Sequence, residues 1–164
     1  MTATYEKIAT TTLGSTASSV AFTSISGSYT DLVLVITAKT SSGPADLLMR
    51  VNGDDNNNYG QTNLYGTGSA AASSRLTNRS VFYCNLVAYP SNNNNSNHIV
   101  QLQNYSNTTT YKTFLSRANN AGVGTDAIVG TWRSTSAISS LTFYADATTF
   151  ASSSIFTIYG IKAE

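Results

Sequence analysis

Several residue types that carry chemistry are scarce in this 164-residue sequence. Cysteine occurs once, at Cys84, which excludes a disulfide within the chain, and its apolar surroundings (VFYCNLVAY) favour a small buried side chain over a reactive thiol. Charged residues make up 10%, with nine Lys and Arg against eight Asp and Glu, and no apolar stretch approaches the ~18 residues of a membrane span. We therefore expect neither nucleic acid nor a membrane as a partner.

Catalytic and phosphate-binding motifs are equally scarce. His98 is the one histidine, it falls in an expected strand, and no G-x-S-x-G segment presents a serine nucleophile. The eight carboxylates are scattered without a spacing that pairs them, and the GVGT segment at 122–125 lacks the lysine of a P-loop. Arg75, Arg79 and Arg117 are too few for a basic stripe. We expect no enzymatic activity and no cofactor.

The segment 54–58, DDNNN, comes nearest to a metal-binding motif. Calcium is bound by clustered oxygen atoms, and an EF-hand loop starting at Asp54 would place Asp54, Asn56 and Asn58 at its first three ligand positions. The pattern then fails, because Tyr59 stands where glycine is needed and Tyr65 where the bidentate glutamate is needed. The sequence predicts a turn held by its own side chains, with a bound cation as the alternative.

Hydroxyl and amide side chains are abundant: the chain holds 23 Ser, 24 Thr and 16 Asn. Apolar residues, 41% of the total, recur in alternating runs separated by polar turns, which indicates a folded all-β chain rather than disorder. We predict one domain over residues 1–164, an antiparallel sandwich of two sheets. The expected strands cover residues 5–13, 19–25, 30–39, 47–52, 61–65, 78–89, 97–104, 111–118, 125–133, 138–145 and 154–162.

The alternation also predicts which strands are central and which segments are loops. In the segment 30–39 both faces are apolar, which indicates a strand covered on both sides. Strands 97–104 and 111–118 alternate apolar with polar residues and should have one wet side. Runs of Asn and Asp at 52–60 and 91–97 predict compact solvated loops, and GTGSAAASS at 66–74 predicts a flexible connection.

Four segments carry a resemblance to a known group of proteins: YEKIATTTLGST, SYTDLVLVITAKT, LLMRVNGDDNNNY and SIFTIYGIKAE. Their order over nearly the whole chain resembles small β-sandwich structural proteins of tailed bacteriophages, including cyanophages. The shared motifs are structural rather than catalytic. The resemblance implies a jelly-roll-like sandwich and a place in the virion.

The same resemblance implies a task. Because the sequence holds no collagen-like or coiled-coil segment, it is more similar to a capsid decoration (cement) protein than to a long fibre protein. Such a protein would bind the outer face of the assembled head, with the major capsid protein and further copies of itself, as a dimer or trimer, as partners. The alternatives are a tail-associated receptor- or carbohydrate-binding module and an internal or tail-tube subunit.

Loop tyrosines and amides are the expected contact residues. Tyrosine combines a large rigid face with one polar tip, and short polar side chains lose little rotamer entropy on docking. We also expect residues 1–7 to form an arm that docks on a neighbouring subunit. The predicted interface residues are Thr2, Tyr5, Asp54, Asn56, Asn57, Tyr59, Tyr65, Asn93 and Asn94.

Overall fold

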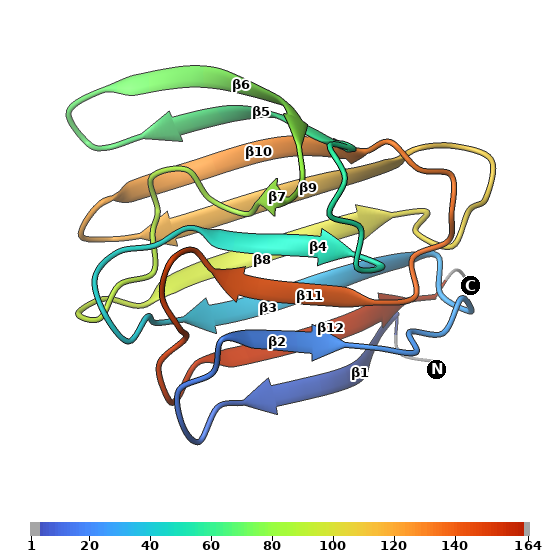
Figure 1. Ribbon diagram of the computed structural model, residues 1–164, viewed down its shortest axis with the longest axis horizontal. Helices are drawn as coiled ribbons and strands as arrows, with labels where there is room; N and C mark the ends of the chain where they lie inside the picture. The colour runs from blue at the N-terminus through green and yellow to red at the C-terminus, as the bar shows by residue number, and fades with distance from the viewer. Residues whose placement is uncertain (1–3, 163–164) are drawn as a thin grey trace.

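The computed structural model describes residues 4–162, which form twelve β-strands and no helix (Figure 1). All strand pairs are antiparallel, in a large sheet with the order β1-β12-β3-β8-β9-β10-β5-β6 and a small sheet with the order β2-β11-β4-β7. The strands are β1 (Tyr5–Thr12), β2 (Ser19–Phe22), β3 (Asp31–Ala38), β4 (Leu47–Val51), β5 (Tyr59–Gly66), β6 (Ala71–Arg79), β7 (Phe82–Tyr83), β8 (Ser96–Gln103), β9 (Lys112–Asn120), β10 (Gly124–Trp132), β11 (Leu141–Ala145) and β12 (Ile155–Ile161). The predicted all-β, two-sheet sandwich is confirmed.

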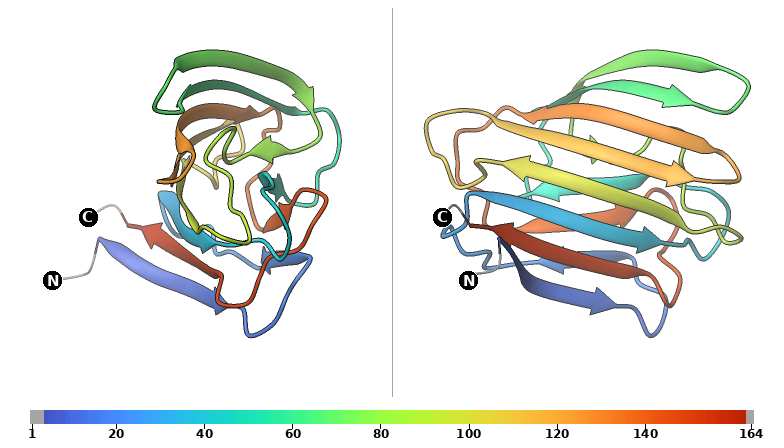
Figure 2. Two further views of the ribbon diagram at one scale, coloured as in Figure 1. Left: turned by 90° about the vertical axis from the view of Figure 1, so that its left-hand side faces the viewer. Right: turned by 180° about the vertical axis from the view of Figure 1, so that it is seen from behind.

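The strand order contains a jelly roll with two insertions. Half of the large sheet, β1-β12-β3-β8, faces the small sheet, and along the chain these eight strands pass back and forth between the two layers. The hairpins β5–β6 and β9–β10 interrupt this path and add four strands to one side of the large sheet (Figure 2). We call these four strands the extension.

The apolar core lies between the two sheets. From the large sheet, alternate residues of β3, β8 and β12 point inward and are fully buried, among them Leu34, Val100 and Ile158. The small sheet supplies Met49 and Phe143, and the Phe143 ring lies 5.8 Å from that of Phe156. This period-2 burial is what the apolar alternation predicted for these strands.

A different packing holds the extension. The short strand β7 approaches it closely, and Phe82 stacks edge-on against Phe114 of β9 at 5.3 Å. Gly130 of β10 makes room for this contact, because a Cβ atom there would overlap the Phe82 ring. From Tyr83 to Tyr89 the chain is largely irregular, and this segment lies against the inner face of the extension.

Polar side chains of the extension satisfy the backbone of that segment. Buried Asp126 accepts hydrogen bonds from the N–H groups of Leu86, Val87 and Ala88 at 2.8–3.2 Å. Ser116 Oγ donates to the Cys84 carbonyl at 2.7 Å, and the Gln61 amide pairs with both backbone groups of Tyr83. Because an irregular backbone cannot leave its polar groups unpaired in a core, the inner face that covers it is polar.

Three predictions about local structure are wrong. Residues 71–74, expected as part of the flexible connection 66–74, belong to strand β6, because pairing with β5 makes a hairpin of this segment. Residues 78–89 are not one strand: Asn78 and Arg79 are the last residues of β6, Phe82–Tyr83 form β7 and pair with β4, and the left-handed backbone of Asn78 (φ 54°) lies at the irregular end of β6. In β3, Val33 is buried but Val35 is 43% exposed, so that strand is covered along only part of its second face.

The N-terminal segment is part of the sheet. Tyr5 to Lys7 pair with Tyr159 to Ile161 of β12 and so belong to an edge strand of the sheet, and the docking of residues 1–7 on a neighbouring subunit stays a prediction. Residues 1–3 lie outside the described residues. The part of the chain that the structure describes contains no helix long and apolar enough to cross a membrane.

Candidate binding face on the large sheet

The outer face of the large sheet is turned away from the small sheet (Figure 2, right), and it carries a row of outward side chains that is aliphatic except for Arg117. The register aligns Leu64, Ala127, Arg117, Ile99 and Val35 across five neighbouring strands. Leu64 is 60% exposed, and Val129, on the same face of β10, is 48% exposed. Large aliphatic side chains gathered on one exposed sheet face are typical of a binding surface.

An apolar hollow of about 360 Å³ lies within this face. Outward side chains of β5, β8, β9 and β10 line it, and the apolar ones outnumber the polar ones: Leu64, Leu115, Ala127 and Val129 against Thr62, Gln101 and Arg117. It is open to solvent along the sheet surface, so it suits a protruding side chain of a partner better than an enclosed small molecule.

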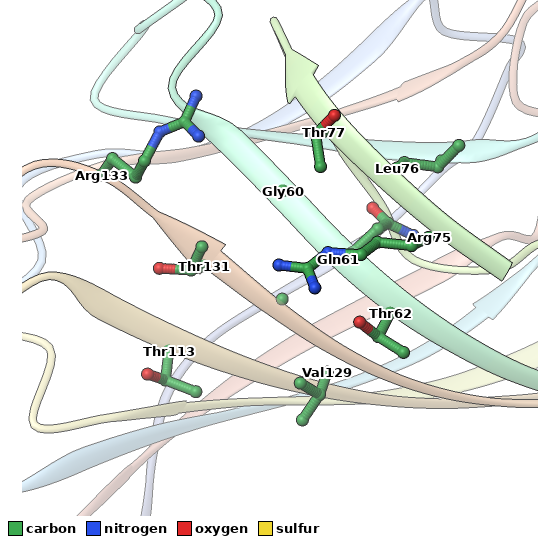
Figure 3. Close-up of a pocket in the computed structure, with 11 residues that line it drawn as sticks. Gly60, Gln61, Thr62, Arg75, Leu76, Thr77, Thr113, Val129, Thr131 and Arg133 are labelled. Atoms are coloured by element: carbon green, nitrogen blue, oxygen red, sulfur yellow. The ribbon is translucent and has the colours of Figure 1, made fainter.

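A second depression, which we call the Arg/Thr hollow, adjoins it where β5, β6 and β10 meet (Figure 3). Its volume is about 300 Å³, and its side chains come from the extension and the residue that follows β10: Thr62, Arg75, Thr77, Thr113, Thr131 and Arg133. In Figure 3 the Arg75 side chain lies across β5, with its guanidinium group between β5 and β10, and the Arg133 guanidinium group lies near the start of β5.

Both hollows are cationic. Arg75, Arg117 and Arg133 contribute to their lining, and neither hollow is lined by a described Asp or Glu. Among the described residues the ion pair is Lys162–Glu6, at the opposite edge of the sheet, so none of the three arginines has a carboxylate partner there. The outer face therefore combines exposed aliphatic side chains with uncompensated positive charge.

The loop that follows β4 anchors Arg133 and holds Asp54. The Arg133 side chain donates to the Asn57 carbonyl and, at 2.8 Å, to Asn78 Oδ1. Asp54 Oδ1 accepts from the backbone and side-chain amides of Asn56, and Oδ2 accepts from Asn58 Nδ2 and from Trp132 Nε1 at 2.6 Å. Both carboxylate oxygens thus serve as acceptors within the fold rather than as open ligands for a cation.

These bonds determine the charge state of Asp54. Partial burial acts to raise its pKa, but the hydrogen bonds from Asn58, Trp132 and Asn56 outweigh burial and lower the pKa to about 2. In the described residues no group of three or more His, Cys, Asp or Glu side chains is arranged to hold a metal ion. The loop is the compact Asx-rich turn that the sequence predicted, and it supports the end of β10.

Tyr59, predicted as an interface residue, is instead buried in the core. It is 1% exposed, and its hydroxyl accepts from the Val51 N–H at 3.0 Å and donates to the Asp54 carbonyl at 3.0 Å. Burial raises its pKa to about 12. Because Tyr59 opens β5 rather than lying in the loop, its ring belongs to the core and offers no face to a partner.

The other predicted interface residues are dispersed. Tyr5 is 54% exposed on edge strand β1, whereas Tyr65 is half-buried near the opposite edge on β5. Asn56 and Asn57 are exposed in the loop after β4, and Asn93 and Asn94 are exposed in the loop before β8. Thr2 lies outside the described residues. The described residues of this set do not gather on one surface, and whether any of them contacts a partner stays a prediction.

The residues of the outer face were not predicted from the sequence as a site. Arg75 and Thr77 fall in β6, where small and polar residues hide the alternation between outward Arg75 and half-buried Leu76. The alternation Ser74, Leu76 against Arg75, Thr77 was the available signal. Arg133 comes to line the same hollow as Arg75 and Thr77 because β10 pairs with β5 and β5 pairs with β6.

No protein-family model matches this chain, and no curated protein matches it. Among solved structures, one similar chain is a protein of unknown function from Shewanella oneidensis MR-1, with 11% identity over 98% of this chain and 77% of that chain. The TM-score is 0.28, a similarity too low to support an argument about fold or function.

Proposed function

We propose that this chain is a structural protein of a bacteriophage virion, a decoration protein that binds the outer surface of the assembled head. The outer face of the large sheet is the observation that carries this proposal, and the resemblance of the sequence to phage sandwich proteins supplies the setting. A protein that binds the assembled shell but not its separated subunits stabilises the shell by mass action, and many copies add their effects. No catalysis is involved.

The size of the outer face supports a role in docking. Eight strands spaced about 4.8 Å apart and about 25 Å long present roughly 900 Å² on one side. A stable protein–protein interface buries about 800 Å² on each partner. The aliphatic row would form the centre of such an interface, and the three arginines favour an acidic patch on the major capsid protein.

Further copies of the chain would meet at the sheet edges. Strands β1 and β6 are edge strands whose outer backbone groups are unpaired within the described sheet. Such edges pair readily with another strand, and dimers or trimers would protect them. Sedimentation of the purified chain tests this part of the proposal. A chain that stays monomeric at every concentration up to its own local concentration on a decorated head contradicts it.

Copy number per particle tests the location. Quantitative mass spectrometry of purified virions should count hundreds of copies, because a decorated head repeats its sites over the whole shell. A handful of copies, with label at the tail, would instead support the receptor- or carbohydrate-binding alternative.

A matched pair of variants tests the surface. Val129→Asp places a charge beside the aliphatic row on the outer face, and Val123→Asp makes the same change at a position 40% exposed in the turn between β9 and β10. We expect Val129→Asp to reduce co-sedimentation with undecorated heads at least about tenfold, the equivalent of roughly 1.4 kcal/mol. Val123→Asp should bind like the wild type; equal loss in both variants would argue against docking through the outer face.

A further inference from the structure

The Arg/Thr hollow has the features of a binding site for a small ligand, independently of any docking on a capsid. Arg133 is held in place: its backbone N–H donates to the Asn58 carbonyl at 2.9 Å, and its side chain donates to Asn57 and Asn78. Both side-chain acceptors are neutral, so the guanidinium charge is positioned without being compensated. A guanidinium has five N–H donors, and those that remain can bind an oxyanion.

Arg75 adds a second positive charge from the opposite strand. It is exposed, and within the described residues no salt bridge involves it. Two arginines on one hollow repel each other unless an anion lies between them. Both arginines line the hollow, Arg75 with its guanidinium group between β5 and β10 and Arg133 near the start of β5 (Figure 3), so a carboxylate or phosphate bound in the hollow would be attracted by both charges.

The threonines define the rest of the ligand. Thr131 Oγ1 donates its proton to the Lys112 carbonyl at 3.1 Å, so toward the hollow it can act as an acceptor of a ligand hydroxyl. Thr62, Thr77 and Thr113 are exposed, and their hydroxyl groups can donate or accept. A carboxylate has no proton to donate, and therefore Thr131 favours a ligand that carries hydroxyl groups as well.

The shape of the hollow depends on Gly60. This glycine lies beside Thr131 in the β5–β10 pairing, where any other residue would project a side chain into the hollow. Val129 supplies apolar surface at one side, which suits the C–H groups of a sugar ring. About 300 Å³ is at the small end of ligand pockets and matches one sugar residue rather than an extended chain.

We propose that the Arg/Thr hollow binds an acidic sugar unit, with the oxyanion group between Arg75 and Arg133 and the ring hydroxyls on the threonines. The oxyanion is a carboxylate, as in a uronic acid, or a phosphate on a sugar. The ligand requires the folded chain alone, so this site is separable from the location of the protein in a virion.

Titrations followed by amide NMR on the purified chain test the proposal. The probes are glucuronate, glucose 6-phosphate, neutral glucose and inorganic phosphate. We expect at least one charged sugar to bind at least about tenfold more tightly than glucose and than phosphate, with shifted amides around Gly60 and Thr131. The tighter of the two charged sugars identifies the oxyanion. Binding of phosphate as tight as that of both sugars overturns the proposal, as does the absence of any saturable shift.

Variants tie the binding to the hollow. Arg75→Gln should weaken binding at least about tenfold, since it removes a charged donor that no internal contact requires. Lys7→Gln, which also removes an exposed positive charge but on β1 at the opposite edge of the sheet, should leave binding within about twofold. Similar affinities for wild type, Arg75→Gln and Lys7→Gln would place the ligand elsewhere and refute the assignment.

A third variant fills the hollow and leaves both arginines in place. A Cβ at Gly60 would lie 3.5 Å from the Leu76 carbonyl oxygen and 3.9 Å from Thr131 Cγ2, which are ordinary contacts, so Gly60→Val is expected to fold. Its melting curve verifies folding, and its titration should show no saturable binding. Binding of an acidic tripeptide, but of neither charged sugar, would replace the sugar with an acidic protein segment and overturn the proposal.

Discussion

The jelly-roll half of the large sheet and the extension carry different side chains on their buried faces. In β3 the inner residues are all aliphatic, and β8 adds Val100 and Leu102 but also Ser96 and His98. In β9, β10 and β5 the buried inner positions include Ser116, Asn120, Asp126 and Asn63. On the outer face of the extension, Leu64 and Val129 are exposed. The extension therefore combines several buried polar side chains on its inner face with exposed aliphatic side chains on its outer face.

The side chains on the two buried faces differ because the two regions pack against different partners. The jelly-roll strands face another sheet, whose backbone groups are already paired, so apolar contact is the best use of the interface. The extension faces the irregular segment 83–89, whose N–H and C=O groups need partners. Side-chain polarity on a buried face thus follows the hydrogen-bonding needs of the opposing backbone. The exposed aliphatic side chains then have no role in the core and are left for binding.

Replacement of Asp126 should disrupt the polar packing between the inner face of the extension and the segment 83–89. Asp126→Ala leaves three buried N–H groups without an acceptor, and we expect a loss of about 3–4 kcal/mol in the free energy of unfolding. For a chain of this size the melting temperature should fall by about 10 °C. The control is Asp55→Ala, an exposed acid that should change stability by less than about 0.5 kcal/mol. Similar effects of the two variants in urea unfolding would show that the segment 83–89 does not depend on Asp126.

His98 should make the same interior sensitive to acid. It is fully buried beside Ser96, at 2.9 Å from Nε2, and its Nδ1 has no hydrogen-bond partner in the described structure. Burial lowers the pKa of His98 to about 4, although the Cys84 backbone opposes the shift. Because the unfolded chain takes up this proton near pH 6.5 and the folded chain does not, stability should fall between pH 6.5 and 4, by about 3 kcal/mol in total.

Urea midpoints of wild type and His98→Gln across this range measure the effect. The wild-type stability should decline with acid, and the variant should lack this part of the slope. Parallel curves for the two proteins would mean that His98 changes its charge equally in the folded and unfolded states.

How far the sequence predicts this molecule depends on whether the relevant contacts are local. The strands β3 and β12 follow from their own apolar alternation, and the Asx-rich turn at Asp54 follows from adjacent residues. By contrast, Ala71–Arg79 has no apolar alternation of its own and becomes a strand by pairing with β5. The role of Asp126 depends on N–H groups that lie far away in the sequence.

The candidate site is less predictable for the same reason. Arg75 and Arg133 become neighbours through two successive strand pairings that involve a bulge between Tyr59 and Gln61. Tyr59 illustrates the opposite error: an Asn-rich neighbourhood predicted exposure, but the hydroxyl satisfies Val51 and Asp54 inside the core. Residue type alone does not separate these cases.

Protonation of Asp46 should change stability in the opposite direction to protonation of His98, so an Asp46 variant sharpens the test of the pH dependence. Burial, helped by the nearby Asp146 charge and only partly offset by the Asn85 hydrogen bond, raises the pKa of Asp46 to about 6. Since the folded chain binds this proton more tightly than the unfolded chain, the charged form costs stability above pH 6. Asp46→Asn should therefore stabilise the protein at pH 8 by about 1 kcal/mol after solvent screening.

The gain should shrink as the pH falls from 6 toward 4, where folded Asp46 is itself protonated. The decline of stability in acid should accordingly be steeper in Asp46→Asn than in wild type. Asp55→Asn is the matched control, and a gain that persists unchanged at pH 4.5 would exclude a charge effect at Asp46.

A substitution on the outer face of the extension should cause the smallest change in the free energy of unfolding. Leu64 is 60% exposed, so Leu64→Ser removes little buried area and should alter the free energy of unfolding by less than about 0.5 kcal/mol. An aliphatic residue of the core such as Leu34, which is fully buried, should cost about 2–5 kcal/mol when replaced by Ala. Urea unfolding measures both. A large loss for Leu64→Ser would mean that the outer face stabilises the monomer, and its aliphatic row would no longer indicate a partner.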